Sequence, residues 1–126
     1  MERRRIASGS PWEPAVGFSR AYRVGDTVHV AGTGPVESDG GCAPDAHGQA
    51  MRCFAIVEAA LRDAGASLDD VVRTRMYVTD PAVMDDVGAA HHAAVGHVRP
   101  AATMVVVAGL ADERWLVEIE AEAVVG

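Results

Sequence analysis

The chain has 126 residues, 49% of them apolar and 23% charged, which is the size and composition of one soluble globular domain. Its 18 acidic and 11 basic side chains give a net charge of −7, which disfavours nucleic acid and anionic membranes as partners. Every basic residue is an arginine, so the sequence excludes Schiff-base lysine chemistry and a phosphate-binding P-loop.

Residues 1–126 are expected to form a single domain that begins with an irregular lead-in over residues 1–17. Two strand-like runs follow at 19–24 and 27–32, and the Gly25-Asp26 pair between them predicts a tight hairpin. A long loop rich in glycine and proline is expected over 33–44.

The clearest helix is predicted over 45–64, because its apolar residues recur at spacings of three and four and Gly65 provides a stop. A strand follows at 71–79. A second helix is predicted over 80–96, with Asp80 as its N-cap and Pro81 at its first position. Two last strands are expected at 102–108 and 115–125.

This order predicts an α+β fold, β-β-α-β-α-β-β, with both helices covering one face of a mixed sheet. The opposite face would then carry charges of both signs on its alternating positions. Those positions are Arg73, Arg75, Tyr77, Glu118, Glu120 and Glu122. An uncovered sheet face in so small a domain commonly finds a partner surface, so we expect an oligomer.

Glu118 and Glu120 would project from one face about 7 Å apart, as residues two apart on a strand do. A buried carboxylate there could orient a water or act as a general acid or base. The alternative is that these glutamates form ion pairs with Arg73, Arg75 or a neighbouring subunit.

His91 lies on the apolar side of the second predicted helix. It is interpreted either as a general base or, more simply, as a core histidine with a satisfied hydrogen bond. The adjacent His91 and His92 point about 100° apart on a helix, so their spacing does not predict a metal site. Cys53 falls in the apolar stripe of the first helix and is expected to be a core residue.

Arg20 and Arg75 are candidate anion binders, with interface salt bridges as the alternative. The basic start of the chain is followed by no apolar run, so it does not resemble a signal peptide. No stretch is long enough to span a bilayer, and a cytoplasmic protein is expected.

Several motifs in this order resemble the RidA/YjgF family, known as enamine/imine deaminases or by the older label endoribonuclease L-PSP. The resemblance covers residues 16–125. It rests on residues 24–32 (VGDTVHVAG), 61–74 (LRDAGASLDDVVRT), 77–80 (YVTD), 99–103 (RPAAT) and 117–121 (VEIEA).

The resemblance implies a chorismate-mutase-like fold and a homotrimer whose sheets form a central barrel, with small-molecule clefts between subunits. It also implies hydrolysis of enamines and imines without a metal or organic cofactor. In that chemistry an arginine binds the substrate carboxylate and a glutamate positions the attacking water.

Carried over by position, the family's glutamate matches Glu118, its cleft glycine matches Gly32, and its early tyrosine matches Phe18. The signature arginine is replaced by Ala102, and the cysteine two residues later by Met104. The expected site therefore has Glu118 as its catalytic residue. The expected cleft residues are Phe18, Gly32, Arg75, His91, Ala102 and Met104.

The missing arginine leaves three hypotheses about the ligand open. The substrate lacks a carboxylate, or Arg20, Arg75 or Arg99 supplies the charge, or the cleft binds a small ligand without catalysis. Ribonuclease activity is disfavoured by the net charge of −7.

Overall fold

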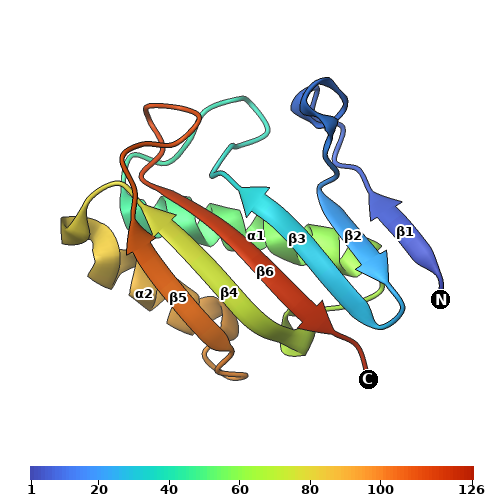
Figure 1. The fold of residues 1–126 in the computed structure, drawn as a ribbon. Helices are drawn as coiled ribbons and strands as arrows, with labels where there is room; N and C mark the ends of the chain where they lie inside the picture. Colours follow the sequence, from blue (N-terminus) through green and yellow to red (C-terminus); the bar gives the residue numbers. More distant parts are fainter.

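The computed structural model describes residues 1–126 and has an α+β fold in which two helices cover one face of a six-stranded mixed sheet (Figure 1). The strands are β1 (Arg3–Ile6), β2 (Ala21–Val24), β3 (Thr27–Thr33), β4 (Val71–Val78), β5 (Ala101–Val106) and β6 (Val117–Val124). The helices are α1 (Ala46–Asp63) and α2 (Met84–Val95). The predicted fold class and helix arrangement are confirmed.

The sheet order is β1-β2-β3-β6-β4-β5, so β6 lies at the centre although it comes last in the chain. All neighbours are antiparallel except β4 and β5, which are parallel and joined through α2. The predicted hairpin forms β2 and β3, with Val24 opposite Thr27 and Gly25 at a φ of +57°. A positive φ is costly for most residues, which explains the glycine in this turn.

The lead-in over residues 1–17 is not irregular throughout, and this expectation was wrong. Residues 3–6 form β1, which pairs antiparallel with β2, and residues 13–17 form a short π-helical turn, η1. In β1 only Ile6 is buried. An edge strand held by backbone hydrogen bonds has no need of apolar alternation, so the sequence pattern did not reveal it.

The core lies between the helices and the inner face of the sheet. Asp45 caps α1 by accepting a hydrogen bond from the Gly48 backbone, and Gly65 follows the helix at a φ of +83°. On β6 the apolar positions alternate inward as predicted. Val117, Ile119, Ala121 and Ala123 are all buried.

Strand β4 departs from strict alternation at its start. The alternation that places Arg73, Arg75 and Tyr77 on the uncovered face would put Val72 on the inner face, but Val72 is 46% exposed and Val71 is buried. The pairing register of β4 against β6 shifts between Val71 and Arg73. A bulge adds one residue to a strand, so residues before it point to the opposite face from the one that strict alternation predicts. This explains why Val71 is buried in place of Val72. None of the helices is long and apolar enough to cross a membrane.

Candidate functional site

The uncovered face of the sheet carries the charged alternates of β4 and β6. Two of the three glutamates of β6 are engaged by neighbouring side chains. Tyr77 donates a hydrogen bond from its hydroxyl to Glu120, and Arg75 forms an ion pair with Glu122 at 3.2 Å between Nη1 and Oε1. His29 also lies 4.0 Å from Glu122. Glu120 and Glu122 therefore belong to a structural network of charges.

Glu118 differs from both, since no hydrogen bond or ion pair within the chain holds its carboxylate. Partial burial raises the pKa of Glu118 above its usual value, and Glu120 adds to this, while the positive charge of Arg20 opposes it. Glu118 is therefore a half-buried carboxylate with free acceptor positions.

Gly32 provides the surface against which Glu118 packs. A β-carbon at residue 32 would lie 2.6 Å from Glu118 Oε2, a distance that no real contact of this type reaches. The glycine stands near the end of β3, where the register against β6 shifts between Val30 and Thr33. Bulges commonly re-aim side chains beside active sites, and this one lies next to Glu118.

Arg20 completes this group. Its Nη2 donates to the Gly32 carbonyl oxygen at 2.6 Å, and its guanidinium carbon lies 5.8 Å from the centre of the Phe18 ring. Phe18 directly follows η1 and is 38% exposed. Residues 18, 20, 32 and 118 thus form one cluster, which we call the Glu118 cluster.

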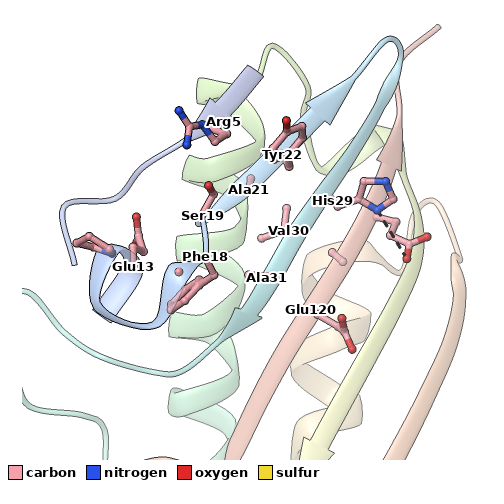
Figure 2. A pocket seen from close by; sticks show the side chains of 14 residues that line it. Arg5, Glu13, Phe18, Ser19, Ala21, Tyr22, His29, Val30, Ala31 and Glu120 are labelled. Carbon is pink, nitrogen blue, oxygen red and sulfur yellow. Dashed lines mark ion pairs between the residues drawn. The ribbon is translucent and has the colours of Figure 1, made fainter. Parts of the chain in front are cut away.

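A groove of about 610 Å³ runs along the uncovered face (Figure 2), and Phe18 is the residue of the Glu118 cluster that lines it. One wall is the lead-in segment from Glu13 to Phe18, and the floor is formed by β2, β3 and β6. Glu13 is buried and accepts a hydrogen bond from the Ser8 backbone at 3.1 Å. This contact holds the wall, and no sequence pattern in the lead-in pointed to it.

The other expected cleft residues lie elsewhere in the chain. His91 is on α2, where its Nε2 lies 2.8 Å from Thr74 Oγ1 and its ring meets Phe54 edge-on. Burial lowers the pKa of His91. Thr74 points into the core, so His91 is on the helix side of the sheet, away from Glu118.

Ala102 and Met104 are on β5, beside Thr74 and Met76 of β4. Parallel neighbours in register point the same way, so both residues face the helix side at the free edge of the sheet. Arg75 is on the uncovered face but is committed to Glu122. The single chain therefore brings Phe18 and Gly32 to Glu118 and leaves His91, Ala102 and Met104 as a separate group, the β5-edge group.

Other reactive side chains are poor candidates for the site. Burial raises the pKa of Cys53 to about 12, which keeps its thiol protonated and confirms it as a core residue. The structure contains no group of three or more His, Cys, Asp or Glu residues arranged to hold a metal ion.

Comparison with known proteins agrees with this fold. The family model described as endoribonuclease L-PSP matches residues 9–125. The crystal structure of Rv2704 from Mycobacterium tuberculosis, a member of the YjgF/YER057c/UK114 family, is 46% identical with a TM-score of 0.91. This match covers 98% of the present chain and all of that one. The chain therefore belongs to the RidA/YjgF family, also described as endoribonuclease L-PSP.

Two further relatives show the range of sequence identity to other proteins of this fold. An uncharacterized protein of Streptomyces coelicolor is 40% identical over 121 residues, which is 95% of this chain and 90% of that protein. RidA from the Antarctic bacterium Psychrobacter sp. is 26% identical with a TM-score of 0.82, over 96% of this chain and 94% of that one.

Proposed function

We propose that this protein is a RidA-like hydrolase that acts on an imine, enamine or related reactive metabolite in a cleft between subunits. The observation that carries the proposal is the state of Glu118. It is the one glutamate of the three on β6 that no neighbouring side chain engages, and it is fixed against Gly32 beside Arg20. A carboxylate with free acceptor positions can hold a water for attack.

The reaction would proceed by addition of that water to the carbon of the C=N bond. Glu118 accepts a proton as the oxygen–carbon bond forms, and it returns the proton to the nitrogen. The hydroxyl proton of this adduct then passes through Glu118 to the amine nitrogen as the C–N bond breaks, so that ammonia leaves and the carbonyl product retains the oxygen of the water. The raised pKa of Glu118 makes it a stronger base than an exposed glutamate would be.

We further propose that the protein is a homotrimer and that the cleft forms between neighbouring subunits. The Glu118 cluster of one subunit would face the β5-edge group of the next. Two features support this arrangement. The uncovered sheet face carries paired charges without a covering layer, and β5 has an unpaired outer edge. His91, Ala102, Met104 and Arg75 are proposed cleft residues in that assembly only.

The test is release of a keto acid from 2-imino acids that an amino-acid oxidase generates in the presence of competing semicarbazide. We expect the wild-type protein to accelerate release and Glu118→Gln to lower the rate by about 10²- to 10⁴-fold, as removal of a general base does. Glu120→Gln is the matched control, because it makes the same change two residues away on a carboxylate held by Tyr77.

An equal loss in both variants would contradict the role of Glu118. Absence of turnover on imino acids and on neutral imines would favour the second candidate, a small-ligand-binding protein of the same fold. That candidate is supported by Ala102, which stands where the family resemblance places the carboxylate-binding arginine.

A further inference from the structure

Arg20 is a half-buried cation without a direct ion-pair partner. Burial lowers the pKa of its guanidinium, and the charges of Glu13 and Glu118 only partly oppose this. No carboxylate forms an ion pair with Arg20. Its Nη2 bonds the Gly32 carbonyl, and its Nε is buried without any hydrogen-bond partner. A partly buried guanidinium without an ion pair destabilises the protein unless an anion binds to it.

The two arginines of β4 on the uncovered face differ from Arg20. Arg75 is neutralised by Glu122. Arg73 also has a buried Nε without a partner, but in register it stands opposite Glu122, four residues along β6 from Glu118. That spacing corresponds to about 13 Å along a strand. Arg20 is therefore the arginine whose unsatisfied charge lies within the Glu118 cluster.

We propose that Arg20 binds the anionic end of the ligand, and that the ligand is a small carboxylate whose reacting carbon lies towards Glu118. This inference rests on the proposed function and specifies its substrate class. Arg20 would supply from β2's side of the sheet the positive charge that Ala102 cannot supply from β5. Phe18, beside the guanidinium, would pack against the apolar part of the ligand.

The binding test compares two stable probes, the anion 2-oxobutanoate and its neutral amide, in ligand-observed NMR titrations. We expect the wild-type protein to prefer the anion. Arg20→Gln should weaken anion binding by at least about 30-fold, as expected when a buried charge pair is broken, and leave binding of the amide within about twofold. Arg20→Lys keeps the charge and should recover part of the anion preference.

Arg62→Gln serves as the control, because Arg62 is an exposed residue of α1 that pairs only with Glu58. Thermal unfolding of each variant separates loss of binding from loss of fold. Retention of the anion preference in Arg20→Gln, or an equal loss for anion and amide in a folded variant, would overturn the proposal.

Turnover distinguishes this inference from the proposed function. If the wild-type protein hydrolyses 2-iminobutanoate and Arg20→Gln does so with the same kcat/KM, Arg20 is not the anion-binding group but the hydrolase proposal stands. If the wild-type protein hydrolyses no imine and still shows Arg20-dependent binding of the anion, the hydrolase proposal fails and the anion site stands.

Discussion

At the scale of single residues, the ionisation of Glu118 acts against folding. Burial raises its pKa in the folded state, so the folded protein favours the protonated carboxyl more than the unfolded chain does. Stability that is present below the unfolded pKa is therefore lost as pH rises through the folded pKa.

We predict that Glu118→Gln unfolds at a higher temperature than the wild-type protein at about pH 7, because glutamine imitates the protonated carboxyl. The difference should disappear at about pH 4 and below, where the wild-type side chain is also protonated. Thermal scans across this pH range measure it. Equal unfolding temperatures at neutral pH would mean that Arg20 fully compensates the buried charge.

The sequence alone was sufficient to place the three glutamates of β6 on one face, because strand alternation determines the face. It could not show which of them would be free. The partner of each depends on the register between β4 and β6, which sets Tyr77 opposite Glu118 and Arg75 opposite Glu120. The side chains then reach diagonally, Tyr77 to Glu120 and Arg75 to Glu122.

At the scale of elements, α1 fixes the loops at the end of the sheet that carries Glu118. Gln49 is buried, and its Nε2 donates to the backbone oxygens of Ala43 at 2.8 Å and Arg114 at 3.0 Å. Its Oε1 accepts from the Leu116 backbone at 2.7 Å. One side chain thereby joins the loop before α1 to the loop before β6.

Gln49→Ala would leave these backbone groups without partners and open a cavity. We predict a loss of about 3 kcal/mol in the free energy of unfolding, since each buried polar group left unsatisfied costs about 1–3 kcal/mol. Urea unfolding measures it. Gln49→Glu keeps the acceptor for Leu116 but sets a buried carboxylate oxygen against the carbonyl oxygens of Ala43 and Arg114, so at neutral pH it should lose at least as much as Gln49→Ala. A loss below about 1 kcal/mol in Gln49→Ala would mean that water replaces the side chain.

The two helices were predictable because their apolar spacing and their caps agree. Asp45 and Gly65 bound the first, and Asp80 caps the turn that leads into the second. β1 was not predictable, because its arginines lack an apolar pattern and its pairing with β2 depends on the backbone. Elements defined by side chains were therefore found, and an element defined by backbone pairing was missed.

At the scale of the whole molecule, the predicted site residues fall into two groups that one subunit does not bring together. The spacing of residues along one chain cannot show whether the two groups meet, because a shared cleft would depend on how copies of the chain assemble. The proposed trimer would have a mass of about three times 13.2 kDa. Sedimentation equilibrium measures it.

A mixing experiment tests whether the cleft is shared. Glu118→Gln inactivates one side of each proposed cleft, and Met104→Trp would obstruct the other. We predict that each variant alone is inactive, and that activity returns after the two are dissociated together and reassembled, since some clefts then combine two unaltered sides. Mixing without dissociation is the control. Persistent inactivity in confirmed mixed trimers would mean that one chain supplies both residues to the same cleft, which would contradict the shared cleft.

The exposed edge of β5 affects how readily the protein aggregates before it assembles. Its outer edge offers unpaired backbone groups, and Val105 and Val106 are 41% and 47% exposed. When nothing covers such an edge, strands of other chains can pair with it, and the protein aggregates. If assembly covers β5, a freshly made or diluted subunit is most vulnerable to precipitation before it meets its partners. The yield of folded protein would then depend on how quickly its copies meet as well as on the stability of each copy.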